Sequence, residues 1–180
     1  MQAPPKGGAF SNSNLQTDDM ITITEFCARH RACPEGRRWA LANCRDMQEA
    51  WGNAQPEWVV WIATRPGVLD DRTLRKFAAW SARQVQHLMT DPRSTHALDV
   101  AERHADGLAT DDELFAACDA ACTAAWAAEG DAAGAAAWAA VRAALLDCGR
   151  YAVRDALWDG EPETKAAWLR ENATPNWEGA

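Results

Sequence analysis

The chain has 180 residues, a length typical of one domain with its own core, and a net charge of −8 at pH 7. It contains 39 Ala and 10 Trp but only 7 Val and 3 Ile, so residues that favour strands are scarce. This composition argues against a β-rich fold, and apolar stretches are too short for a membrane span. We therefore expect an all-α protein, a compact bundle of about seven to nine helices.

The amino-terminal residues 1–19 are rich in Pro, Gly, Ser and Asn and lack the pattern of a secretory signal. We expect a disordered leader there, followed by a single helical domain over residues 20–180. Because an export signal is missing, we expect the protein in the cytoplasm, where the six Cys would stay reduced. We expect most of these Cys to be small buried residues and expect no cofactor.

Proline and capping signals punctuate the first half of the chain. They predict four short helices: residues 24–31, a helix begun by Pro34, a turn capped by Asp46 with Glu49, and a helix begun by Pro56. The clearest amphipathic pattern covers residues 71–89, with apolar residues at three- and four-residue spacing. Its basic residues are expected on the outer, solvated face: Arg72, Arg75, Lys76 and Arg83.

The second half of the chain is richer in alanine. Asp91 and Pro92 predict a helix that Gly107 ends, and Thr110 with Glu113 forms a capping-box pattern before the alanine-rich segment. Residues 119–130 and 131–142 form an internal repeat, read either as two helices separated at Gly130 or as one long helix. A last helix follows Pro162, and residues 172–180 are expected to form a frayed tail.

Charge is distributed unevenly along the chain. Residues 1–90 carry a net charge of +2 (11 basic, 9 acidic), whereas residues 91–180 carry −10 (7 basic, 17 acidic). Such a field repels phosphate groups, so direct nucleic-acid binding is not expected, and it attracts a basic protein surface. The acidic residues that lie where no Lys or Arg occurs are the candidate partner-binding residues: Asp106, Asp111, Asp112, Glu113, Asp119, Glu129 and Asp131.

Candidate catalytic and metal-binding patterns are weak. Cys27, His30 and Cys33 have zinc-ligand chemistry but not the spacing of a structural zinc module. Cys118 and Cys122 share a helix face, which fits a packing stripe as well as a metal site. No phosphate loop, dinucleotide fingerprint or nucleophile motif occurs. We therefore expect neither a catalytic site nor a metal site.

Residues 94–140 resemble a family of small, Ala- and Trp-rich helical proteins, the immunity proteins of bacterial toxin–immunity loci and prophages. The resemblance rests on the segment Ala97–Arg103, the turn at Gly107, the Thr110 cap with Glu113, and the alanine tract with its Trp. The residues before Met20 depart from the family pattern. The resemblance implies an inhibitor that binds a toxin and occludes it without chemistry of its own.

Three further interpretations remain open from the sequence, of which one is a helical enzyme or a metal-binding regulator with scattered residues. A phage anti-defence protein of the anti-CRISPR kind would use an acidic helical surface to fill the basic nucleic-acid channel of a defence-complex subunit. A structural or assembly protein would instead associate with itself, for example as a homodimer, through alanine faces and exposed Trp. The immunity, anti-defence and assembly interpretations all describe a protein that acts by contact.

Overall fold

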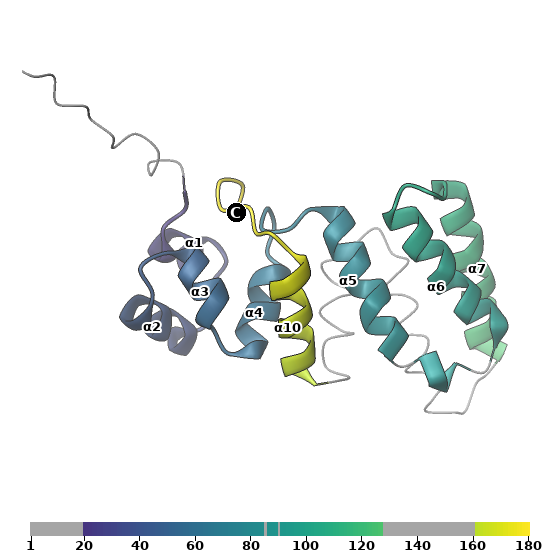
Figure 1. Ribbon diagram of the computed structural model, residues 1–180, viewed down its shortest axis with the longest axis horizontal. Coiled ribbons are helices and arrows are strands. Elements are labelled where there is room, and N and C mark those ends of the chain that lie inside the picture. Colours follow the sequence, from purple (N-terminus) through teal and green to yellow (C-terminus); the bar gives the residue numbers. More distant parts are fainter. Residues whose placement is uncertain (1–19, 85, 90, 128–160) are drawn as a thin grey trace, which may run out of the picture.

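The computed structural model describes residues 20–84, 86–89, 91–127 and 161–180. In these residues the chain forms eight α-helices and one short 3-10 helix, with no strand (Figure 1). The expected all-α fold is therefore confirmed. The leader at residues 1–19 and the break at Gly130 lie outside the described residues.

The helices follow the order of the punctuation signals. Their bounds are α1 Ile23–Arg29, α2 Pro34–Asn43, α3 Met47–Asn53, α4 Pro56–Ala63, α5 Asp71–Gln84, η1 Gln86–Leu88, α6 Pro92–Ala105, α7 Asp111–Ala127 and α10 Pro162–Asn172. The helix expected over residues 71–89 ends five residues early, at Gln84. The chain tightens there into the 3-10 turn η1, after which Asp91 caps α6.

Side-chain caps explain where several helices begin. Asp46 accepts a hydrogen bond from the Glu49 amide at 2.8 Å, and Asp91 accepts one from the Arg93 amide at 2.8 Å. Both were expected as helix starts. A third cap was missed: Thr22 forms a reciprocal capping box with Glu25, so α1 begins one residue before the predicted range.

The larger hydrophobic core lies among α1 to α5 and α10. Its most deeply buried large side chains include Phe26, Leu74, Phe77 and Leu169. Helix α10 packs against α4 and α5, so a late segment of the sequence completes a core that the early helices begin (Figure 1). Burial of aromatic and aliphatic surface in this core favours folding of the helices that form it.

The carboxyl-terminal residues do not form the frayed tail that the sequence predicted. Trp177 is 5% exposed and contacts Phe26 and Trp51 in edge-to-face geometry, and Ala180 is 1% exposed. The Trp177 indole N–H also donates to Gln48 Oε1 at 2.9 Å. The prediction was wrong because one large indole provides enough buried area to hold a segment that is otherwise polar.

A second, smaller core joins α5, α6 and α7. Alanine dominates it, with Leu98 and Val100 as its larger buried members. Small side chains let helices approach closely, which agrees with the alanine-rich composition. Helix α6 packs against both α5 and α7.

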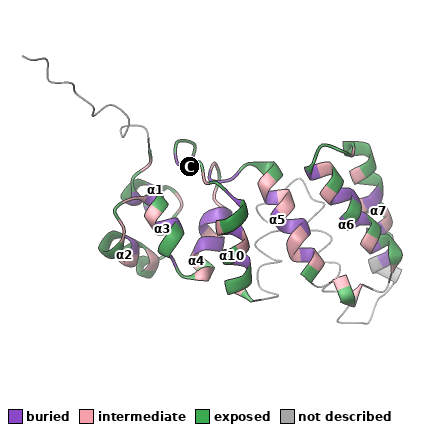
Figure 2. Ribbon diagram, in the orientation of Figure 1, coloured by how far each residue is buried: buried purple, intermediate pink, exposed green. Residues whose placement is uncertain are grey.

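Along its longest axis the molecule places α2 near one end and α7 at the other (Figure 1). Both helices carry exposed residues on their outer sides (Figure 2). Among the described residues, none of the helices combines the length and apolar character that crossing a bilayer requires.

Candidate functional site

The connection between α6 and α7 is tightly defined. Gly107 adopts φ +75°, the left-handed conformation that favours glycine, and the Leu108 amide donates to the Arg103 carbonyl at 2.7 Å. The α7 cap follows at once: the Glu113 amide donates to Thr110 Oγ1 at 3.2 Å, and the Thr110 amide donates to Glu113 Oε2 at 2.8 Å. The capping box predicted from the sequence is confirmed, and it fixes the direction of α7.

Two large apolar side chains project into solvent at this end of the molecule. Phe115 is 76% exposed and Leu108 is 68% exposed. Asp111 and Asp112 precede Phe115 by four and three residues, and Asp119 follows by four, so all three flank Phe115 on the helix surface. We call this set, with Leu108, the α7 surface.

Asp106 does not belong to the α7 surface, although the sequence grouped it there. Its carboxylate lies 2.6 Å from Lys76 Nζ and 3.2 Å from Arg72 Nη2, so it faces α5. These two hydrogen-bonded cations hold the pKa of Asp106 below its ordinary value. Asp106 therefore pairs α6 with α5 within the molecule.

Asp111 and Glu113 also have partners within the chain. Asp111 Oδ1 lies 2.7 Å from His104 Nε2. Because the Arg75 guanidinium can only donate to His104 Nδ1, at 3.0 Å, the imidazole proton sits on Nε2 and points at Asp111. Glu113 lies 3.4 Å from Arg103, and its hydrogen bonds with Thr110 lower its pKa, helped by the nearby Arg103 charge.

Asp112 and Asp119 are exposed, and within the described part of the chain neither carboxylate has a hydrogen-bond or ion-pair partner. Glu129 and Asp131, the remaining candidates, lie outside the described residues. The structure thus separates the predicted acidic group. One member stabilises the α5–α6 contact, two combine local pairing with exposure, and Asp112 and Asp119 are exposed.

The basic residues of α5 were expected on an outer, solvated face, and this is confirmed only in part: Arg72 is exposed, whereas Arg75, Lys76 and Arg83 are half-buried. Arg83 binds Asp99 and Glu102 of α6, and Arg72 donates to the Ala105 carbonyl at 2.8 Å as well as to Asp106. The apolar pattern predicted correctly which side of α5 is buried. It could not show that α6 lies along the edge of that side, where the cations meet carboxylates.

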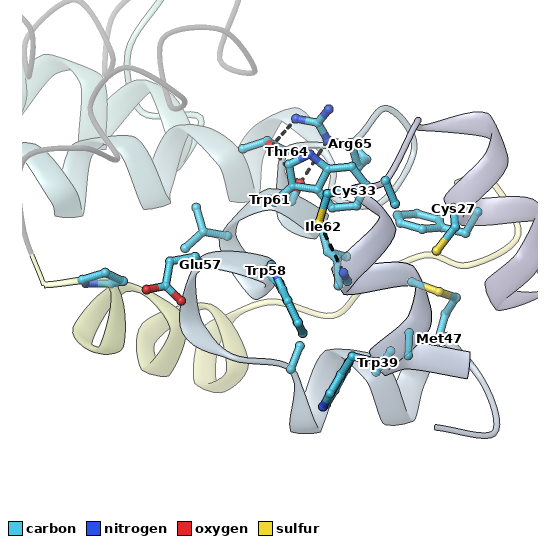
Figure 3. Close-up of a pocket in the computed structure, with 18 of the residues that line it drawn as sticks. Cys27, Cys33, Trp39, Met47, Glu57, Trp58, Trp61, Ile62, Thr64 and Arg65 are labelled. Carbon is cyan, nitrogen blue, oxygen red and sulfur yellow. Dashed lines mark hydrogen bonds between the residues drawn. The ribbon is translucent and has the colours of Figure 1, made fainter. Parts of the chain in front are cut away.

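A pocket of about 530 Å³ opens at the other end of the molecule, among α1 to α4 and α10 (Figure 3). Its walls are mostly apolar and include Trp39 and Trp58, whose rings lie 5.3 Å apart. Charged side chains at Glu57, Arg65 and Lys165 also line it. The volume is within the range of small-molecule sites, so the pocket can accept an apolar group.

The expectation of mostly buried cysteines is wrong for the five that the structure describes, because only Cys27 is buried. Cys27 is buried and burial raises the pKa of its thiol, whereas Cys33 is exposed and caps α2 by accepting from the Gly36 amide. Cys118 and Cys122 lie with their sulfurs 3.9 Å apart on α7 and are half-buried. Among the described residues, His, Cys, Asp and Glu form no group of three or more that could hold a metal ion.

Comparison of the chain with family models, with curated proteins and with solved structures finds no match. The site must therefore be interpreted from its own geometry. The sequence predicted the acidic residues of the α7 surface but missed Leu108 and Phe115 as its apolar members. The helical periodicity could have revealed Phe115. The buried side of α7 contains Ala117 and Ala121, and Phe115 is out of phase with these positions, so it points away from the core.

Proposed function

We propose that this protein is a non-catalytic inhibitor of the immunity type, a cytoplasmic protein that occludes a basic surface of a partner protein with its α7 surface. The observation that carries the proposal is Phe115, 76% exposed and flanked by three carboxylates. Large exposed aromatic residues in a polar rim are typical of the energetic centres of protein interfaces.

The charge of the surface indicates the chemistry of the partner. Asp112 and Asp119 have no described cation beside them, so their negative field extends into solvent. A partner with Lys or Arg around an apolar recess would match both the carboxylates and the ring. Such complementarity mainly speeds association and selects the partner, while the desolvated ring slows dissociation.

The partner class has two candidates that use this surface in the same way. A toxin inhibited by occlusion would agree with the resemblance to immunity proteins. A subunit of a nucleic-acid-binding defence complex would offer a basic channel, in which the carboxylates replace phosphate groups. The alanine-lined packing of α6 and α7 supports both, because it holds the surface on rigid helices.

The test is affinity capture from the native host with three baits, followed by mass spectrometry. The surface variant combines Asp112→Lys, Phe115→Ala and Asp119→Lys, and the control variant combines Glu171→Lys and Glu178→Lys, both exposed and far from α7 in the sequence. We expect one basic protein to be retained by the wild type and the control and lost by the surface variant.

Purified partner then allows the interaction to be measured. We expect the association rate of the wild type to fall steeply with salt, and that of the surface variant to be slower and nearly independent of salt. Circular dichroism of each bait verifies folding. Equal retention of the same protein by all three baits would show that the α7 surface is not the binding site.

A further inference from the structure

Helix α2 presents an exposed apolar residue between two cations. Leu41 is 50% exposed, and Arg37 and Arg38 precede it by four and three residues, so both flank it on the helix surface. Both arginines are exposed, and neither guanidinium has a hydrogen-bond or ion-pair partner among the residues that the structure describes. Trp39, which lines the pocket, lies on the opposite side of the helix from Leu41. We call Arg37, Arg38 and Leu41 the α2 surface.

The α7 surface repeats this spacing with the opposite charge. Asp111 and Asp112 precede the exposed Phe115 by four and three residues, as the arginines precede the leucine in α2. If the two helices pack together, each apolar side chain can cover the other, while carboxylates face guanidinium groups. Arg binds carboxylates with two parallel hydrogen bonds, which favours this pairing over a lysine equivalent.

Within one molecule these two surfaces cannot meet. Helix α2 lies near one end of the longest axis and α7 lies at the opposite end (Figure 1). A second copy of the chain, however, carries a surface complementary to the α2 surface. Its charge, its exposed apolar residue and the spacing between them all match.

We propose that the protein associates with itself head to tail, with the α7 surface of one copy bound to the α2 surface of the next. The contact joins different surfaces, so it is heterologous, and every assembly that does not close into a ring has one free α2 surface and one free α7 surface at its ends. Assemblies therefore grow with protein concentration.

This inference rests on the proposed function for its acidic side, because both use the α7 surface, but it also requires α2. A basic partner bound to α7 competes with the next copy. Binding of the partner therefore shortens the assemblies, so self-association holds the inhibitor in a form that the partner releases.

Sedimentation equilibrium of the purified full chain at low salt tests the proposal. We expect the weight-average mass of the wild type to rise with concentration beyond that of a dimer and to fall when salt is added. Arg37→Glu with Arg38→Glu, and separately Asp112→Lys with Asp119→Lys, should each lower the association constant roughly tenfold or more. The control Glu171→Lys with Glu178→Lys should behave as the wild type does.

Mixing the two charge-reversed variants gives the decisive result. Each reversed variant alone presents surfaces of like charge and should associate only weakly. In a mixture, the acidic α7 surface of one variant faces the basic α2 surface of the other, and the two reversed surfaces are complementary as well, so mixing should restore the association that neither variant shows alone. A wild type that stays monomeric at every concentration overturns the proposal, as does an assembly that both reversals leave intact.

Failure of this inference is distinguishable from failure of the proposed function. The α2 variant keeps the whole α7 surface, so it should capture the basic partner as well as the wild type does. Loss of self-association in this variant with normal capture supports both proposals. A wild type that captures the partner through α7 but never self-associates contradicts the further inference alone.

Discussion

Arg83 binds Glu102 through two hydrogen bonds: Nε lies 2.8 Å from Oε1, and Nη2 lies 2.7 Å from Oε2. The pair joins α5 to α6, and Nη2 also lies 2.5 Å from Asp99 Oδ1. These charge-assisted bonds raise the pKa of Arg83 above its ordinary value, so it stays cationic wherever the protein is folded. The position of the α7 surface depends on this contact, because α7 packs against α6 and α6 packs against α5.

Arg83→Met should therefore destabilise the protein. We expect the free energy of unfolding to fall by roughly 1–2 kcal/mol. The loss is moderate because both carboxylates are partly exposed to solvent, which weakens the ion pairs. Urea denaturation at neutral pH measures the change. Arg93→Met is the matched control, because the side-chain partner of Arg93 among the described residues is Asp91, two positions earlier, and its loss should cost clearly less. Equal costs for the two variants would contradict a special role for Arg83.

Gly67 tests the packing of the carboxyl-terminal residues, and Gly52 is its control. Gly67 has φ +87°, and a Cβ there would collide with the Gly179 carbonyl. We expect Gly67→Ala to lower the free energy of unfolding by about 1–3 kcal/mol. Gly52, in α3, has open space around its Cβ position, so Gly52→Ala should instead raise it by about 0.5–1 kcal/mol. Thermal unfolding of the two variants should thus shift in opposite directions.

The capping box of α7 should control the order of the α7 surface. Thr110→Ala removes the acceptor for the Glu113 amide, and we expect a loss of roughly 1 kcal/mol. Thr110→Ser keeps the oxygen and should lose little. Hydrogen exchange provides the local measurement: amides in the first turn of α7 should exchange faster in the alanine variant only. Uniformly faster exchange along the chain would instead indicate global destabilisation.

His30 should make stability depend on pH. Burial lowers its pKa, and the nearby Arg65 and Arg29 lower it further; its Nε2 is buried without a partner among the described residues. Because the unfolded chain binds this proton more readily, the free energy of unfolding should fall as pH drops below about 6.5, until pH passes the folded-state pKa.

Urea titrations from about pH 7.5 to about 5 measure this slope. His30→Gln should flatten it over that interval, whereas His87→Gln, at an exposed position of η1, should leave it unchanged. If the slope survives in the His30 variant, another group is responsible for it.

Local signals in the sequence predicted most helix starts. Thr110 with Glu113, Asp46 and Asp91 cap helices where their side chains indicated, because capping depends on residues only a few positions apart. Predictions failed where distant segments meet. Trp177 is held by Phe26 and Trp51, more than a hundred positions earlier, and no local pattern encodes that contact.

The same division holds for the candidate site. Composition and charge by themselves determined an all-α protein with an acidic region around residues 106–119, because helix propensity and net charge are sums over residues. Only the tertiary structure decided which carboxylates remain available. In the folded chain, Asp106 forms ion pairs with Lys76 and Arg72, whereas Asp112 and Asp119 lie beside the exposed Phe115. Pairing and exposure depend on which helices become neighbours, and packing across the whole chain settles that.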